Sequence, residues 1–283
     1  MEEAVVLDRR SDVAFAGAGI GYRRRYREAL LAGGDEPKPA VLEIIPDHFF
    51  ANPMDLKPLA DRYELVFHEV SLSAGTAAFE DDAHLSRTAD LMKHASPFLF
   101  TEHLAVTCSP SGLDLGHLAP VWYTAETLNI LVKRISRWQD LLNVPVALEN
   151  ITAPFVIPEA EMPEHEFLTE LTQRTGCGLL LDVTNLLINS RNFGYDPVEQ
   201  ILKYPIHRVQ QVHLAGGKSM QGWWVDSHSE PLELKSLELF SLLRGKAPLV
   251  TAIVERDANL PPFADLVSEA RRVEKIWKHG MDK

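Results

Sequence analysis

The chain has 283 residues, 46% of them hydrophobic and 24% charged, which is typical of a soluble enzyme with a large core. Its formal net charge of −12 argues against a large nucleic-acid-binding surface, and two cysteines, Cys108 and Cys177, are too few for a disulfide framework. The N-terminal segment MEEAVVLDRRSD lacks the features of a signal peptide and no apolar run is long enough to cross a bilayer, so we expect a cytoplasmic protein without membrane or nucleic-acid partners.

Short apolar runs alternate with longer segments of helical spacing along the chain. The candidate strands are residues 14–19, 41–45, 64–71, 98–104, 144–149, 178–183, 208–214 and 250–255. Several of these runs are almost continuously apolar, as expected of parallel strands that are buried on both faces.

The intervening segments carry helix signals. Residues 22–32 form the first candidate helix, Asp82 lies at the start of the next, and Thr124 can cap a third. Pro163 and Pro262 suit the first turns of two later helices. This alternation predicts a parallel sheet with right-handed crossovers. At this length the best solution is one α/β domain, a (β/α)₈ TIM barrel over residues 1–283, and an open doubly wound sheet is the alternative.

Six consecutive candidate strands, the third to the eighth, place histidine or carboxylate side chains at or just after their ends. Active sites of barrels form at the carboxyl ends of the strands. Buried ionisable groups are unfavourable unless they are paired or bind a metal. The candidate metal ligands are His68, His103, Glu149, Asp182, Asn185, His213, Asp226, His228 and Glu255.

This ligand set contains four imidazoles, four carboxylates and one amide, which is enough for two or three ions. Nitrogen and oxygen ligands without thiolate suit iron, manganese or zinc. Glu149 lies between the two early histidines and the later ligands in strand order, so it is the natural bridging carboxylate. Asp226 and His228 can lie on one side of an extended segment. Each residue alone could be an ordinary hydrogen-bonded core group, but the joint pattern favours a metal site.

The same residues resemble the multinuclear non-haem iron-dependent oxidases, a family that includes the methanobactin-biosynthesis enzyme and was long uncharacterised. The matching stretches are Gly17-Ala18-Gly19-Ile20-Gly21, His68-Glu69-Val70-Ser71-Leu72-Ser73, Glu102-His103-Leu104, Leu148-Glu149-Asn150, Leu180-Leu181-Asp182-Val183-Thr184-Asn185, His213-Leu214-Ala215-Gly216, Asp226-Ser227-His228 and Glu255-Arg256-Asp257. They span nearly the whole chain, and their combination is specific although each stretch alone is weak.

The resemblance implies a barrel with two or three irons (Fe²⁺/Fe³⁺) that uses dioxygen to modify a residue, expected to be cysteine, of a ribosomally made precursor peptide. It also implies a partner protein that recognises the peptide leader, and it makes Glu149 and Asp182 the expected catalytic residues. The implied ligands are His68, His103 and Glu149 for one iron, Glu149, Asp182, His213 and Glu255 for the second, and Asn185, Asp226 and His228 for a weaker third.

The sequence departs from the family pattern in places that bear on the third metal and the substrate pocket. After the second strand, where the family usually has a Glu-Asn pair, this chain has Ile45-Pro46-Asp47-His48-Phe49-Phe50. Thr184 replaces an asparagine, and Gly217 replaces a histidine. The ligand order also resembles endonuclease IV-like and xylose-isomerase-like barrels, in which zinc or manganese activates water or a sugar hydroxyl. A metal-dependent hydrolase or isomerase and a non-catalytic peptide-binding barrel therefore stay open as alternatives.

Two further features allow two interpretations each. The tryptophan pair Trp223-Trp224 either lines the mouth of the barrel or buries a loop. The arginine cluster at residues 23–27 is expected to be a solvated helix face, with a grip on an acidic peptide as the other reading.

Overall fold

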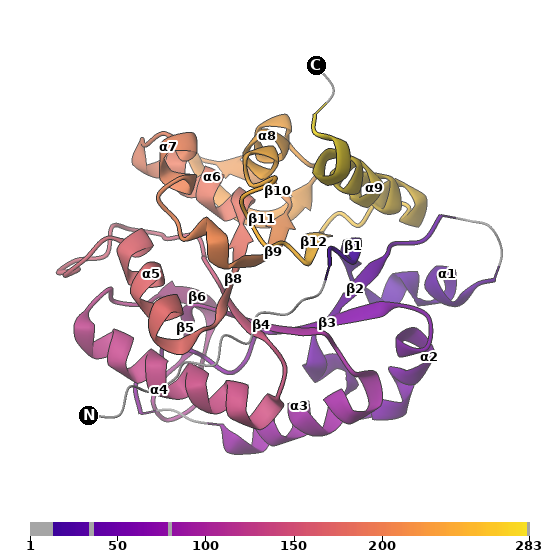
Figure 1. Cartoon of the computed structure of the whole chain (residues 1–283), viewed down its shortest axis with the longest axis horizontal. Helices are drawn as coiled ribbons and strands as arrows, with labels where there is room; N and C mark the ends of the chain where they lie inside the picture. The colour runs from indigo at the N-terminus through magenta and orange to yellow at the C-terminus, as the bar shows by residue number, and fades with distance from the viewer. Residues whose placement is uncertain (1–13, 34–36, 79–80, 282–283) are drawn as a thin grey trace.

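The computed structural model describes residues 14–33, 37–78 and 81–281. The N-terminal segment discussed above lies outside the described residues. Parallel strands close into a barrel in the order β1, β12, β9, β8, β7, β4, β3, β2, and the helices surround it (Figure 1). The closed barrel confirms the predicted fold class and excludes the open doubly wound sheet.

The barrel strands agree with the predicted runs except at the first. They are β1 (Gly17–Gly21), β2 (Val41–Ile44), β3 (Glu64–Glu69), β4 (Leu99–His103), β7 (Val146–Glu149), β8 (Gly178–Asp182), β9 (Val209–Leu214) and β12 (Thr251–Val254). The first strand was expected at residues 14–19, but the glycine-rich stretch is itself the strand. A Cβ on Gly19 would lie 2.3 Å from the Val41 carbonyl oxygen, so β1 and β2 approach as closely as they do because this position has no side chain.

The helices pack their apolar faces on the barrel. They are α1 (Arg27–Leu31), α2 (Lys57–Ala60), α3 (Asp82–Ala95), α4 (Ala125–Leu142), α5 (Glu164–Thr175), α6 (Val183–Phe193), α7 (Pro197–Ile201), α8 (Leu234–Leu242) and α9 (Phe263–His279), with 3₁₀ turns η1 (Arg24–Tyr26), η2 (Pro46–Phe49), η3 (Pro53–Asp55) and η4 (Ile206–Arg208). Thr124 caps α4 as predicted, because its side chain accepts a hydrogen bond from the Thr127 amide. No helix in the described ranges has both the length and the apolar character that a membrane crossing requires.

The predicted helix over residues 22–32 is wrong in its first part. Arg23 is extended, with φ −129° and ψ 132°, and the chain then forms η1 before α1 begins at Arg27. The guanidinium of Arg23 donates to the Arg256 carbonyl, which lies beyond the end of β12. This contact joins the segment after β1 to the segment after β12 and holds Arg23 outside a helix.

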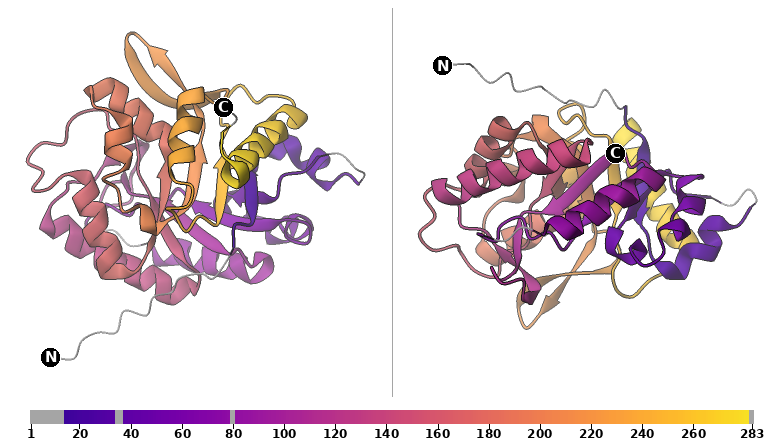
Figure 2. Two further views of the ribbon diagram at one scale, coloured as in Figure 1. Left: turned by 45° about the horizontal axis from the view of Figure 1, so that its top comes forward. Right: turned by 90° about the horizontal axis from the view of Figure 1, so that it is seen from below.

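Two antiparallel hairpins lie beyond the carboxyl ends of barrel strands, in segments where no strand was predicted. One consists of β5 (Ala105–Cys108) and β6 (Asp114–Pro120), and the other of β10 (Gly216–Met220) and β11 (Trp223–Glu230). Gln221 and Gly222 join β10 to β11, and both have positive φ, the conformation that matches the twist of a two-residue hairpin. The β10–β11 hairpin projects from the barrel (Figure 2). Asp226 and His228 therefore lie on a strand rather than in a loop.

Candidate metal centre

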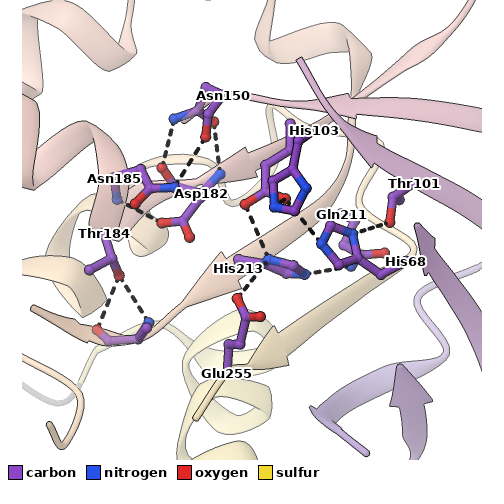
Figure 3. Close-up of polar contacts among 12 residues, drawn as sticks. His68, Thr101, His103, Asn150, Asp182, Thr184, Asn185, Gln211, His213 and Glu255 are labelled. Atoms are coloured by element: carbon purple, nitrogen blue, oxygen red, sulfur yellow. Dashed lines mark hydrogen bonds and ion pairs between the residues drawn. The ribbon is translucent and has the colours of Figure 1, made fainter. Parts of the chain in front are cut away.

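The predicted site residues converge at one end of the barrel interior. His68, His103, Glu149, Asp182 and His213 all lie at or near the carboxyl ends of their barrel strands. The imidazole of His68 lies 4.7 Å from that of His103 and 5.2 Å from that of His213, measured between ring centres. Figure 3 shows the three rings pointing toward one another, with Asp182 and Glu255 beside them. Residues far apart in the sequence thus share one buried polar centre.

The first group consists of His68, His103 and Glu149. The Nε2 atoms of His68 and His103 lie 3.6 Å and 3.5 Å from Glu149 Oε2. The other ring nitrogen of each histidine faces a second partner: Nδ1 of His68 lies 2.8 Å from the Thr101 hydroxyl, and Nδ1 of His103 lies 3.5 Å from Glu102 Oε1. The hydrogen bond with Thr101 fixes the ring of His68, while Glu102 only approaches the ring of His103, and both Nε2 atoms are directed at the carboxylate.

The second group consists of Glu149, Asp182 and His213, so Glu149 belongs to both groups. Glu149 Oε1 lies 3.4 Å from His213 Nδ1, on the other side of the carboxylate from the first group. The Nε2 atom of His213 lies 2.8 Å from Glu43 Oε2, which leaves Nδ1 free to act as a ligand. One carboxylate therefore stands between two sets of potential ligand atoms.

The third group consists of Asp182, His228 and Glu255. His228 Nδ1 lies 3.1 Å from Glu255 Oε2, and His228 Nε2 lies 3.7 Å from Asp182 Oδ2 and 2.6 Å from Asp226 Oδ1. Glu255 Oε2 is also 3.2 Å from His213 Nδ1, so this carboxylate stands between the second and third groups. The implied assignment put Glu255 with the second ion alone, whereas the geometry also brings it to His228.

Asn185 lies in the first turn of α6, behind Asp182. Its backbone amide donates to Asp182 Oδ1, and its side-chain amide donates to the Asn150 carbonyl. The Oδ1 atom of Asn185 is buried and accepts no hydrogen bond from any described residue. Asn185 thus holds one oxygen of Asp182 in place while its own oxygen is left as a possible ligand.

The donor set fits metal ions. Within the described part of the chain, several buried atoms of this centre lack a hydrogen-bond partner: Glu149 Oε2, Asp182 Oδ2, Asn185 Oδ1, His213 Nδ1, Asp226 Oδ1 and His228 Nε2. Each buried polar atom left without a partner is unfavourable by about 1–3 kcal/mol. Cations at the three groups would satisfy these atoms together, and oxygen and imidazole donors suit first-row transition metals.

The pKa values of the centre show how its histidines and carboxylates affect one another. Burial raises the pKa of Asp182 to about 8, and the Glu149 carboxylate adds to this shift. Burial alone would lower the pKa of His213, but the carboxylates of Glu43 and Glu149 hold it well above its usual value. Burial alone would raise the pKa of Glu255, but the neighbouring histidines hold it well below its usual value. Protons on His213 and His228 thus balance the carboxylates, whereas burial holds the pKa of His68 well below its usual value and leaves that ring neutral.

Sequence reasoning missed two contributors. Glu43 lies within β2, is 4% exposed, and pairs with His213 across the barrel. A single acidic residue inside an apolar strand was the available signal. Arg23, expected on a solvated face, instead donates to the Arg256 carbonyl, pairs with Asp257 and approaches Glu255 Oε1 to 3.9 Å. It thereby anchors the segment that presents Glu255.

A cavity of about 390 Å³ lies beside the third group. Its lining includes Trp223, Trp224 and Asp226 of β11, together with His117 of β6. The guanidinium of Arg191 lies 3.9 Å above the Trp224 ring. Of the two readings of the tryptophan pair, the structure supports a position at the mouth of the barrel, between the two hairpins.

Comparison with known proteins agrees with this architecture. UPF0276 proteins from Caulobacter vibrioides (33% identity over 272 residues, 94% of this chain and 96% of the relative) and Chromobacterium violaceum (35% over 263 residues, 91% and 94%) are similar along their length. Among solved structures, a D-psicose 3-epimerase (12% identity, TM-score 0.54, 94% of this chain and 100% of that one) and an endonuclease IV from Thermus thermophilus (14%, 0.53, 94% and 99%) share the xylose-isomerase-like barrel.

At these identities the solved structures show the fold alone. The family described as "RiPP precursor modification enzyme MbnB/TglH/ChrH" matches residues 17–278, where RiPP denotes a ribosomally synthesised and post-translationally modified peptide. The match covers all eight barrel strands and the helices between them. This chain therefore belongs to the MbnB/TglH/ChrH family of RiPP precursor modification enzymes.

Proposed function

We propose that the chain, as a single catalytic domain over residues 1–283, is a multinuclear non-haem iron-dependent oxidase that uses dioxygen to modify a cysteine of a ribosomally made precursor peptide. The observation that carries the proposal is the position of Glu149, whose two oxygens face different histidine groups at 3.4–3.6 Å. A carboxylate placed in this way suits two adjacent ions. Membership of the RiPP precursor modification family supports a peptide as the substrate.

In this proposal the ligand residues set the number and spacing of the irons. Glu149 is shared by the first and second groups and Asp182 by the second and third, so these two residues take the catalytic roles. Iron, when bound there, supplies the redox chemistry with dioxygen. Thr101 and Glu43 hold the rings of His68 and His213 in the orientations that ligation requires.

The remaining residues at the mouth bind and shield the substrate. We propose that the precursor peptide enters through the cavity bordered by Trp223, Trp224 and Asp226. Aromatic side chains there can pack on an extended peptide and exclude water from the reacting thiol. Recognition of the leader is assigned to a separate partner protein, as the family resemblance implies.

The test is anaerobic purification followed by elemental analysis and reconstitution with ferrous iron. We expect at least two irons per chain, and oxygen uptake together with a mass change when a cysteine-containing precursor peptide is added. A peptide with serine in place of that cysteine is the matched control and should give neither. Full turnover with zinc alone, without oxygen consumption, would reject the oxidase and favour a hydrolase or isomerase.

A further inference from the structure

A second cluster of metal-type ligands lies on the outer side of the barrel wall. His68 and Glu69 are consecutive in β3, so their side chains point to opposite faces of the strand. His68 joins the centre inside the barrel, whereas Glu69 points outward and accepts a hydrogen bond from Thr88 of α3. His84 of α3 and Asp47 of η2 complete this outer cluster. It shares no residue with the three groups of the interior centre.

The three side chains converge on one point. Glu69 Oε2 lies 2.9 Å and Asp47 Oδ2 lies 3.7 Å from His84 Nε2. Glu69 is fully buried and His84 is 5% exposed, while Asp47 is half-buried. One ligand atom from each residue lies within 4.8 Å of the others, which is the spacing that a single ion can span.

An ion pair accounts for this arrangement only in part. Burial alone would lower the pKa of His84, but the carboxylates of Glu69 and Asp47 hold it above its usual value, as in an imidazolium–carboxylate pair. His84 Nε2 has no hydrogen-bond partner among the described residues, although Glu69 is within ion-pair distance, because the contact is off the direction of a hydrogen bond. A single N–H can also serve only one of the two carboxylates that face it. Glu69 Oε1 already accepts from the backbone amides of Val70 and Ser71, which holds this carboxylate in place.

We propose that Asp47, Glu69 and His84 form a separate binding site for one divalent transition-metal ion. Two carboxylates and a neutral imidazole balance the charge of such an ion and satisfy the buried nitrogen. Two oxygen donors and one imidazole suit zinc, manganese or ferrous iron.

The site opens onto a second cavity, which shares His117 with the cavity beside the third group. Asp47 and His84 line a hollow of about 540 Å³ together with Ser71, Asp114 and His117. Three protein ligands leave at least one coordination position, and here it faces the cavity, where water or an anionic group can fill it. The ion would therefore be exchangeable and open to small ligands rather than enclosed.

The experiment compares metal binding by the wild-type chain, His84→Gln and His94→Gln, with Mn²⁺ as the only added ion. His94 lies on the same helix α3 but is exposed, so it is the matched control. After equilibrium dialysis, elemental analysis should find one Mn²⁺ fewer per chain in His84→Gln, and no change in His94→Gln. Equal Mn²⁺ content in all three folded proteins would overturn the site.

Two further variants keep the test independent of folding and of the oxidase proposal. Asp47→Asn changes a half-buried residue, so it should fold even if His84→Gln does not, and it should lose the same single equivalent. In a His68→Ala/His213→Ala/His228→Ala chain each of the three interior groups lacks a histidine, and one Mn²⁺ should still bind with a paramagnetic resonance signal. That signal should vanish when Asp47→Asn is added. Its persistence would refute the site without bearing on iron or dioxygen.

Discussion

Replacing Glu149 by glutamine keeps the shape of the side chain but removes the charge shared by the first two groups. Glu149 Oε2 lies 3.6 Å from His68 Nε2, and Oε1 lies 3.4 Å from His213 Nδ1, so two neighbouring ions would lose the same ligand. Two unit charges about 4 Å apart interact by about 4 kcal/mol at an effective dielectric constant of ~20. A ferrous ion carries two unit charges, so each ion should bind at least roughly a thousandfold more weakly.

Elemental analysis after equilibrium dialysis against buffered ferrous iron under anaerobic conditions measures this loss. Glu102→Gln is the control, because burial raises the pKa of Glu102 to about 7 and its oxygens accept from the backbone amides of Leu72 and His103. Glu102 lies beside His103 but belongs to none of the three groups, so its substitution should weaken iron binding only about 10–100-fold. If folded Glu149→Gln retains the iron content of the wild type, Glu149 does not bridge two ions.

Three other expectations follow from the same geometry. Metal affinity should rise from about pH 6 to pH 9, because an ion must displace protons from Asp182, with a pKa of about 8, and from His103, with a pKa of about 9. Competition with a chromophoric chelator measures this affinity, and an affinity that does not change with pH would contradict the prediction. Trp223→Ala should raise the KM for the peptide several-fold and leave the metal content unchanged, since Trp223 lines the cavity but belongs to no ligand group. Gly19→Ala should lower stability by about 1–3 kcal/mol in thermal unfolding, because its Cβ meets the Val41 carbonyl at 2.3 Å; an unchanged Tm would show that β1 can move.

The barrel could be predicted because parallel strands buried on both faces leave continuous apolar runs in the sequence. β8, whose residues are all buried, is a clear example, and Asp182 at its end follows directly from that pattern. The two hairpins left no such signal. β6 is exposed over most of its length and β11 is only partly buried, so neither carries an apolar run. Their strands exist because tight turns bring polar segments together.

The same limit applies to the residues that support the centre. A search restricted to strand ends finds His68 and His213 but passes over Glu43, which lies inside β2 and meets His213 only across the closed barrel. In the sequence, His84 is one more residue of an amphipathic helix. Its contact with Glu69 depends on the packing of α3 against β3. Contacts of this kind depend on how distant segments are packed, so the local spacing of residues in the sequence does not predict them.

The strand register sets the level of each ligand along the barrel. His103 is the register partner of Glu149, and Asp182 is the partner of His213, so each pair faces the interior at one level. Glu149 pairs with Leu180, which places Asp182 two residues, or about 6.6 Å, further toward the mouth.

This step lets Asp182 reach from His213 inside the barrel to His228 on the projecting hairpin. The third group is therefore the one beside the cavity that Asp226 and the tryptophans line. We expect an ion bound there to be the first that an entering peptide meets. Because His228 is held by a hairpin, at a strained φ of +43°, rather than by the barrel wall, we also expect that ion to exchange fastest.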